Sequence, residues 1–187
     1  MTRSFRTRPP SLIASSRRAK IAGANAFPTV IERQPSIGDI HPLDKKRLRE
    51  LLPSLPQEYL YGLRSIELRP RKNAFVGYPF AQYRIKEKVI CLFSLPFPTW
   101  SMPKLRKESR RIYRRFGADV ISDSNSSQVH WPDVESLRRF QNEFVFLHEL
   151  GHHYQYRFKT KKPLPADVFY EELLADAHSR RLAQIKC

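Results

Sequence analysis

The sequence predicts an α+β fold, in which a short and mostly antiparallel sheet packs against helices. Apolar and polar residues alternate, or form short apolar runs, between residues 65 and 93, as they do in strands. A strongly apolar helical pattern follows Pro132, and another helical pattern extends from about residue 167 to residue 184. The 187 residues suit one domain with a tail and are enough to bury a core without disulfides.

The first 40 residues predict a basic, flexible arm that precedes a domain over residues 41–187. No apolar periodicity persists in this segment, and Glu32 is its first acidic residue. The basic residues before it are Arg3, Arg6, Arg8, Arg17, Arg18 and Lys20. An Arg- and Ser-rich segment with few acidic residues also suits an organelle transit peptide, which is the alternative interpretation.

A short helix and two strands are expected after the arm. The helix begins with Pro42 as its first residue and ends before Pro53, and its leucines share one face. Residues 65–68 alternate in the way that a half-buried strand requires. Residues 75–80 predict a second short strand, which lies at an edge or is irregular because Pro79 interrupts it.

Two hairpins and a basic helix are expected in the middle of the chain. Residues 83–93 predict the first hairpin, with a polar turn at residues 86–88. The proline-rich residues 95–103 predict a loop, and residues 104–116 predict a helix that stops at glycine 117. Two apolar pairs around residues 120–131, separated by a polar run, predict the second hairpin.

The net charge favours acidic partners. The chain has 34 Lys and Arg against 18 Asp and Glu, a formal net charge of +16. A field of this size attracts nucleic acid or another polyanion, such as an anionic membrane or an acidic protein. A charge that only keeps the protein soluble is the alternative. The helix predicted over residues 104–116 concentrates the charge, and its candidate polyanion contacts are Arg106, Lys107, Arg110, Arg111, Arg114 and Arg115. A solvated basic face over a narrow apolar stripe is the alternative.

Cysteine usage and hydropathy bear on the compartment. Cys91 and Cys187 are far apart in the sequence and do not suggest a disulfide framework. No apolar run is long enough to span a bilayer, and no signal-peptide pattern precedes a cleavage-like site. We therefore expect a cytoplasmic protein without a transmembrane segment.

The segment His148-Glu149-Leu150-Gly151-His152 carries the main chemical signal. His148 and His152 are four residues apart, so on a helix both imidazoles project from one face and can reach one metal ion. Glu149 lies on the neighbouring flank, where it can touch a metal-bound water. A histidine pair with a purely structural role is the alternative. Because unpaired polar groups are costly in an apolar helix, these three side chains need partners.

A third metal ligand is expected from the last predicted helix. Glu172 and Asp176 are four residues apart and share a helix face, whereas Glu171 lies about 100° away. One carboxylate can ligate the metal while the other orients a ligand histidine. Glu171 or His178 in the third ligand position is the alternative assignment.

Together, HELGH at residues 148–152 and EELLAD at residues 171–176 resemble the gluzincin metallopeptidases. In that family a glutamate in an E-x-x-[AS]-[DN] segment of a later helix completes HExxH. The minigluzincins and the ImmA/IrrE-type peptidases are similar in size, and the resemblance covers residues 144–180. It implies a zincin-like domain whose sheet packs on the HExxH helix and on a C-terminal helix that bears the glutamate. Gln155 and Phe158 exclude the metzincin pattern, which requires a glycine and a histidine there.

The resemblance implies a role for each matched residue. His148, His152 and Glu172 would bind one Zn²⁺ ion. Glu149 would be the general base that activates a zinc-bound water, and Asp176 would accept a hydrogen bond from His148. The implied activity is hydrolysis of peptide bonds in a protein or peptide substrate. The alternative function is a latent or non-catalytic zinc protein that associates with nucleic acid through its basic arm and basic helix.

The same resemblance implies further site residues. Small gluzincins bind extended substrate along an edge strand, for which Val89–Phe93 is the candidate. An ordinary buried strand is the alternative for these residues. A tyrosine or histidine stabilises the oxyanion in larger members, and the candidates for that role are Tyr154, Tyr156, Tyr170 and His178. His153 projects off the metal face and is expected to be a packing or surface residue.

Overall fold

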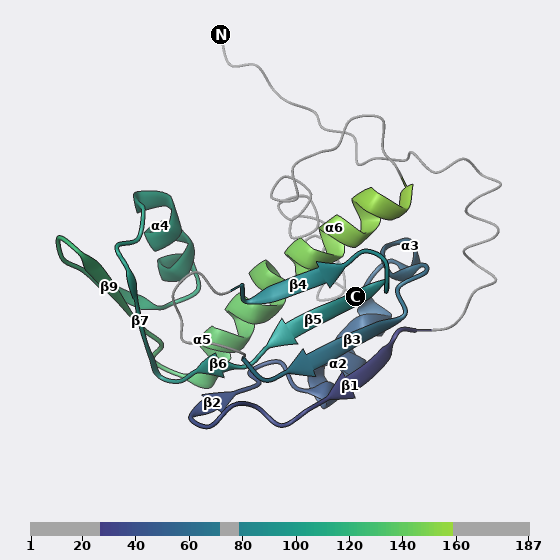
Figure 1. The fold of residues 1–187 in the computed structure, drawn as a ribbon, viewed down its shortest axis with the longest axis horizontal. Coiled ribbons are helices and arrows are strands. Elements are labelled where there is room, and N and C mark those ends of the chain that lie inside the picture. The colour runs from purple at the N-terminus through teal and green to yellow at the C-terminus, as the bar shows by residue number, and fades with distance from the viewer. Residues whose placement is uncertain (1–26, 72–78, 159–187) are drawn as a thin grey trace, which may run out of the picture.

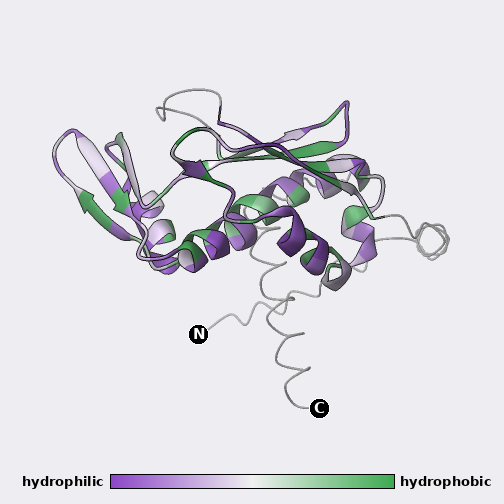
Figure 2. Cartoon of the chain, turned by 90° about the horizontal axis from the view of Figure 1, so that it is seen from below, coloured by the Kyte–Doolittle hydropathy of each residue, from purple (hydrophilic) through white to green (hydrophobic). Residues whose placement is uncertain are grey.

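The structure is a computed structural model that describes residues 27–71 and 79–158 of the 187-residue chain. It has the mixed α+β fold that the sequence predicts (Figure 1). Short strands form three sheets, and helices cover one face of the largest sheet, so that strands and helices make two layers (Figure 2). None of the helices in the two described ranges is both long enough and apolar enough to cross a membrane.

The elements are short, and their bounds are as follows. The strands are β1 (Thr29–Glu32), β2 (Asp39–Ile40), β3 (Ser65–Arg69), β4 (Ala81–Arg84), β5 (Val89–Phe93), β6 (Leu95–Pro96), β7 (Thr99–Pro103), β8 (Asp119–Ser122) and β9 (Ser126–His130). The helices are α2 (Lys45–Leu51), α3 (Gln57–Leu60), α4 (Lys107–Arg115), α5 (Val134–Arg139) and α6 (Leu147–Phe158), with a 3₁₀ turn η1 (Leu52–Ser54) and a π-helix η2 (Phe140–Phe146).

The largest sheet has the strand order β1-β3-β5-β4. β1 runs parallel to β3 and β3 runs parallel to β5, whereas β4 returns antiparallel to β5 as an outer strand. The pairs β2–β6, β7–β9 and β8–β9 are antiparallel. Most strand pairs in the described residues are thus antiparallel, as predicted, but the largest sheet is mixed.

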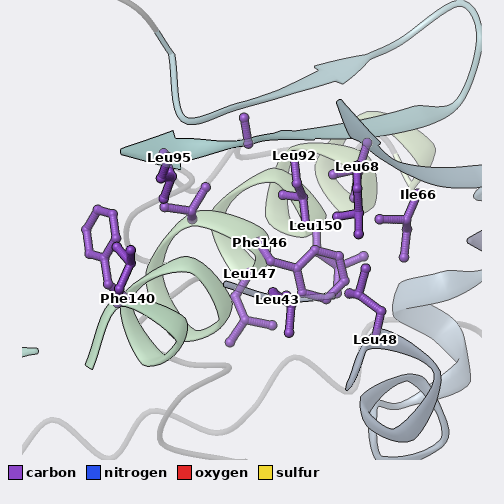
Figure 3. Packing of buried hydrophobic residues seen from close by; sticks show 14 of the residues in the cluster. Leu43, Leu48, Ile66, Leu68, Leu92, Leu95, Phe140, Phe146, Leu147 and Leu150 are labelled. Atoms are coloured by element: carbon purple, nitrogen blue, oxygen red, sulfur yellow. The ribbon is translucent and has the colours of Figure 1, made fainter. Parts of the chain in front are cut away.

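The main core lies between this sheet and the helices. Leu68 on β3 and Leu92 on β5 are opposite each other and fully buried. They point toward Phe146 and Leu150, which are also fully buried, from the helical layer (Figure 3). Burial of one such side chain stabilises the fold by about 1.5–3 kcal/mol. This packing places α6 against the sheet.

Helices α5, η2 and α6 follow one another without a break from residue 134 to residue 158. Asp133 caps the start, because its Oδ1 accepts a hydrogen bond from the backbone N–H of Ser136 at 2.7 Å. The wider turns of η2 include Gln141, whose buried amide donates to the carbonyl oxygen of Phe93 at 3.0 Å and accepts from the N–H of Leu43 at 2.9 Å. The helical layer is therefore tied to β5 and to the segment before α2.

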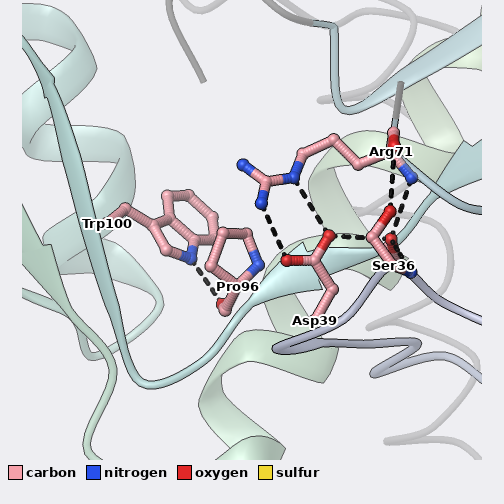
Figure 4. A network of polar contacts seen from close by, with 6 residues as sticks. Ser36, Asp39, Arg71, Pro96 and Trp100 are labelled. Carbon is pink, nitrogen blue, oxygen red and sulfur yellow. Dashed lines mark hydrogen bonds and ion pairs between the residues drawn. The ribbon is translucent and has the colours of Figure 1, made fainter. Parts of the chain in front are cut away.

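A buried polar cluster joins the ends of β3 and β5 to β2 (Figure 4). The guanidinium of Arg71 donates two hydrogen bonds to the carboxylate of Asp39, at 2.9 and 3.0 Å. The Ser94 hydroxyl donates to Asp39 at 2.9 Å and accepts from the backbone N–H of Arg71 at 3.0 Å. Two-point pairs of this kind are strong and directional, so the cluster holds these strand ends in one arrangement.

Sheet β7-β9-β8 and helix α4 form a lobe, residues 99–130, that projects from one end of the molecule (Figure 1). Trp100 of this lobe contacts Trp131 with ring centroids 5.2 Å apart and Tyr113 with centroids 5.8 Å apart. Phe140 on η2 lies 5.2 Å from Trp131, which joins the lobe to the helical layer. Gly117 follows α4 with φ +93°, the left-handed conformation that ends a helix, as predicted.

The structure corrects the predicted arm. Residues 29–32 form β1 in the largest sheet, and residues 39–40 form β2, so the prediction of an arm through residue 40 is wrong for these two segments. Only Val30 and Asp39 of these strand residues are buried, which leaves too short a pattern to recognise. Residues 1–26 lie outside the described part of the chain.

The first helix and the loop predicted after the first hairpin also differ from the sequence prediction. The first helix begins after Asp44, which caps the N–H of Arg47 at 2.8 Å, rather than at Pro42. The loop predicted over residues 95–103 is wrong, because β6 and the outer strand β7 occupy it; prolines are tolerated at strand ends and sheet edges. The strand at residues 65–69, both hairpins and the basic helix are confirmed.

Two predicted elements extend beyond the residues that the structure describes. Residues 75–78 of the predicted second strand lie outside the described ranges, and Pro79 and Phe80 are not in a strand. The predicted last helix, residues 167–184, also lies outside them. The helix expected after Pro132 is present and begins at Val134, after its cap Asp133.

Candidate metal and catalytic site

The two histidines of the HELGH segment meet on one face of α6. The Nε2 atoms of His148 and His152 lie 3.0 Å apart, and the two rings are nearly perpendicular, at 89°. Two nitrogen atoms that bind one tetrahedral zinc ion at about 2.0–2.1 Å are about 3.4 Å apart. A shift of a few tenths of an ångström would give the separation that a shared metal needs, so the two imidazoles fit a common zinc ion.

Glu149 points from α6 toward the outer strand β4. Its Oε2 accepts a hydrogen bond from the backbone N–H of Tyr83 at 2.6 Å. Burial raises the pKa of this carboxyl group, and the charge of His148 and the Tyr83 N–H oppose that rise. A carboxyl group with a raised pKa is a candidate proton acceptor.

The hydrogen-bond alternation of β4 explains why the Tyr83 N–H faces the helix. Phe93 donates its N–H to the carbonyl of Phe80 at 3.0 Å, and every second residue of an antiparallel pair repeats this pattern. The backbone groups of Ala81 and Tyr83 therefore point away from β5, toward the open edge of the sheet. Val89–Phe93, the predicted edge strand, is instead an inner strand between β3 and β4. The edge-strand assignment is therefore wrong, the alternative of a buried strand is confirmed, and β4 is the edge strand beside α6.

His153 holds the side chain of the same tyrosine. Its Nδ1 lies 2.9 Å from the Tyr83 hydroxyl, and its Nε2 lies 3.1 Å from the carbonyl oxygen of Tyr61. A carbonyl can only accept, so Nε2 carries the proton and Nδ1 accepts from Tyr83. The ring is completely buried, and burial lowers the pKa of His153 to about 4. His153 is thus a neutral packing residue, consistent with its predicted position off the metal face.

A tight turn after α3 brings Tyr61 to α6. Gly62 in this turn has φ +79°, and a Cβ atom there would lie 3.1 Å from Nε of Arg157. The guanidinium of Arg157 lies over the Tyr61 ring, 5.1 Å from its centroid. The left-handed backbone conformation favours glycine at this position, and an added Cβ would also displace the Arg157 side chain.

Several of the remaining predicted site residues lie outside the part of the chain that the structure describes. Glu172, Asp176, Glu171, Tyr170 and His178 lie outside the described residues, so the predicted third ligand and its neighbours are not placed. Within residues 27–71 and 79–158, no three His, Cys, Asp or Glu side chains form a group that could hold a metal. The two histidines therefore need a ligand from elsewhere in the chain to complete a zinc site.

Two candidates for oxyanion stabilisation can be placed. Tyr154 is buried and meets the ring of Tyr59 edge-on, with centroids 5.2 Å apart, so it packs α6 on α3. Tyr156 is exposed on the surface of α6.

Tyr83 is the site residue that the sequence did not single out. Its strand was predicted correctly, but its proximity to Glu149 depends on the strand order, which no local pattern records.

Comparisons with known proteins add no assignment. No protein-family model matches the chain, and no curated protein and no solved structure matches it at a significant level.

Proposed function

We propose that this chain is a zinc-dependent metallopeptidase whose site is built on α6. The observation that supports this most directly is the convergence of the His148 and His152 Nε2 atoms to 3.0 Å on the helix that also carries Glu149, whose carboxylate is held at the outer strand β4.

Three residues would hold the metal. His148 and His152 would supply two nitrogen ligands, and Glu172 is proposed as the third ligand from the C-terminal part of the chain. A bound zinc ion would polarise the substrate carbonyl and lower the pKa of a water molecule. The proposed partner of the neighbouring Asp176 is His148, whose orientation it would fix.

Glu149 would carry the proton in this reaction. Its carboxylate would accept a proton from the attacking water and then deliver it to the leaving amine. The Tyr83 N–H, 2.6 Å from Oε2, would hold the carboxylate in position without adding a charge. The raised pKa of Glu149 suits both steps, because a group that titrates closer to neutral pH can accept and release the proton.

The outer strand β4 would hold the substrate. An extended peptide can add to an exposed strand through main-chain hydrogen bonds, and the outward carbonyl groups of Ala81 and Tyr83 lie at such an edge. The outward N–H of Tyr83 is already bound to Glu149. The substrate would therefore be an extended protein or peptide segment. The free, buried thiol of Cys91 fits a cytoplasmic setting for this activity.

The proposal is tested with the full-length chain and two single variants. Zinc content is measured after dialysis, and cleavage is followed on denatured, fluorescently labelled casein. Glu149→Gln should retain zinc and lower the cleavage rate by about 100-fold or more. The matched control is Glu143→Gln, a carboxylate on η2 that pairs with Arg139 at 3.8 Å, and it should cleave at close to the wild-type rate.

Each outcome is informative. Full activity in Glu149→Gln would rule out the proposed base. Zinc retained after His148 and His152 are both replaced by alanine would rule out the ligand set. A wild-type chain that binds zinc but cleaves nothing would favour the alternative function, a latent or non-catalytic zinc protein associated with nucleic acid.

A further inference from the structure

Helix α4 presents an unusually dense positive charge. Five of its nine residues are basic, and Glu108 is its one acidic residue. The basic residues are Lys107, Arg110, Arg111, Arg114 and Arg115. Arg106 precedes them and is exposed.

Part of this charge lies on the face that points away from the core. Tyr113 and Phe116 are buried under the lobe, at 5 % and 2 % exposure, and define the inner side of the helix. At 100° per residue, Lys107, Arg111 and Arg114 lie close to the opposite side. Lys107 and Arg111 are one turn apart, about 5–6 Å, and both are exposed.

Lys107, Arg111 and Arg114 form a row, the α4 row, and the packing of the lobe makes this row rigid. Tyr113 contacts Trp100 and Phe140 of the aromatic cluster, which fixes the helix on its sheet. Nη2 of Arg114 donates to the carbonyl of Val120 at 2.9 Å, which ties the end of α4 to β8. The charges therefore stand on a fixed scaffold rather than on a free helix.

The acidic residues of the lobe do not neutralise it. Residues 99–130 contain seven Lys and Arg and three acidic residues, the latter being Glu108, Asp119 and Asp123. Asp123 is engaged in the β8–β9 turn, where its Oδ1 accepts from the N–H groups of Asn125 and Ser126 at 2.7 and 2.6 Å. Its charge is thus directed to the backbone of the turn.

The other exposed residues of the lobe narrow the choice among anionic partners. A helix that lies in a membrane surface buries its apolar face in lipid, but the apolar face of α4 is already packed in the lobe. Ile121 is the one large apolar side chain of the lobe that is exposed. Single-stranded nucleic acid is bound on exposed aromatic side chains, whereas Trp100 and Tyr113 are buried. A row of cations without such side chains suits a row of phosphates.

From these observations we propose that α4 is a contact surface for the phosphate backbone of duplex nucleic acid. The contact is electrostatic and independent of base sequence, because phosphate contacts position a protein without reading bases. This surface lies on the projecting lobe, and the proposal does not depend on the metallopeptidase activity.

The test compares two double charge reversals in the full-length chain. Lys107→Glu with Arg111→Glu removes two of the three cations of the α4 row. Lys46→Glu with Arg49→Glu changes the net charge by the same amount on α2, where both side chains are exposed and which lies away from the lobe (Figure 1). Binding to a fluorescent DNA duplex of mixed sequence is titrated at several salt concentrations, and circular dichroism checks that both variants are folded.

The α4 variant should bind the duplex at least about 10-fold more weakly and lower the salt slope by about 2, since each lost phosphate contact removes about 0.9. The α2 variant should stay close to wild type. Equal losses in both variants would show that net charge alone is responsible and would overturn the proposal. Tighter binding to a single strand, or α4-dependent binding to anionic vesicles in place of the duplex, would overturn it as well.

Discussion

Helices α6 and α4 both carry polar residues that suggest function, but they hold them in different ways. On α6, Glu149 is held by a hydrogen bond from the Tyr83 N–H, and His153 is held by the Tyr83 hydroxyl and the Tyr61 carbonyl. On α4, Lys107 and Arg111 are exposed to solvent. Directional contacts in a buried setting are sensitive to single substitutions, whereas solvated charges add up gradually.

This difference separates two kinds of functional signal. A buried polar group must find a partner, so each contact near α6 identifies a specific neighbour. A solvated charge needs no partner, so the sequence of α4 indicates only the sign of its charge and no individual contact. Substitutions in the two regions should therefore differ in their effect on stability.

The largest effect is expected at Phe140, where the two regions meet. This ring is completely buried and lies 5.4 Å from Tyr113 and 5.2 Å from Trp131, measured between ring centroids. Phe140→Ala should lower the free energy of unfolding by about 3–5 kcal/mol, because it leaves a cavity in the aromatic cluster. Urea denaturation provides the measurement.

The same experiment shows whether lobe and helical layer unfold together. Trp100 and Trp131 are the two tryptophans of the chain and both contact the cluster, so fluorescence reports on this junction. Far-UV circular dichroism reports on the helices. Coincident transitions would show one cooperative unit. A loss below about 1 kcal/mol would contradict the packing described for Phe140.

The next effect is a pH dependence that originates at His153. Burial lowers the pKa of this ring in the folded state to about 4, against 6.5 for an ordinary histidine. Below pH 6.5 the unfolded chain binds a proton at His153 that the folded chain does not bind. The free energy of unfolding therefore has its full value above that pH and decreases as the pH falls toward 4. The loss should reach about 3 kcal/mol, at about 1.4 kcal/mol for each pH unit.

A variant isolates this contribution from other acid effects. His153→Gln has no titrating group at this position, so its free energy of unfolding should fall less than that of the wild type between neutral pH and pH 4. Urea denaturation at a series of pH values measures the difference. Parallel pH profiles for the two proteins would show that His153 is not buried in its neutral form.

The smallest effect is expected on α4. The double variant Lys107→Glu with Arg111→Glu should change the free energy of unfolding by no more than about 0.5 kcal/mol, because exposed charges contribute little to stability. Its effect on nucleic-acid binding should nevertheless be large. A strongly destabilised variant would show instead that these side chains support the packing of the lobe.

Part of the candidate site could be predicted from the sequence. The helical repeat places His148 and His152 one turn apart wherever the helix lies, and the structure has their Nε2 atoms 3.0 Å from each other. The local pattern also predicts the hairpin that contains Tyr83. The continuous apolar run Val89–Phe93 is typical of a buried inner strand, which was the alternative interpretation and is what the structure has. The sequence could not predict that the other hairpin strand, β4, would lie beside α6.

The sequence by itself determined the elements with strong local patterns and the spacing of residues along them. It predicted the HELGH helix, the basic helix α4 and both hairpins, because hydrophobic periodicity and caps act between residues that are close in the chain. Only the tertiary structure decided that β4 faces α6, that Tyr83 contacts both Glu149 and His153, and that residues 29–32 complete a mixed sheet. These features depend on packing between segments far apart in the sequence, and local propensity does not encode such contacts.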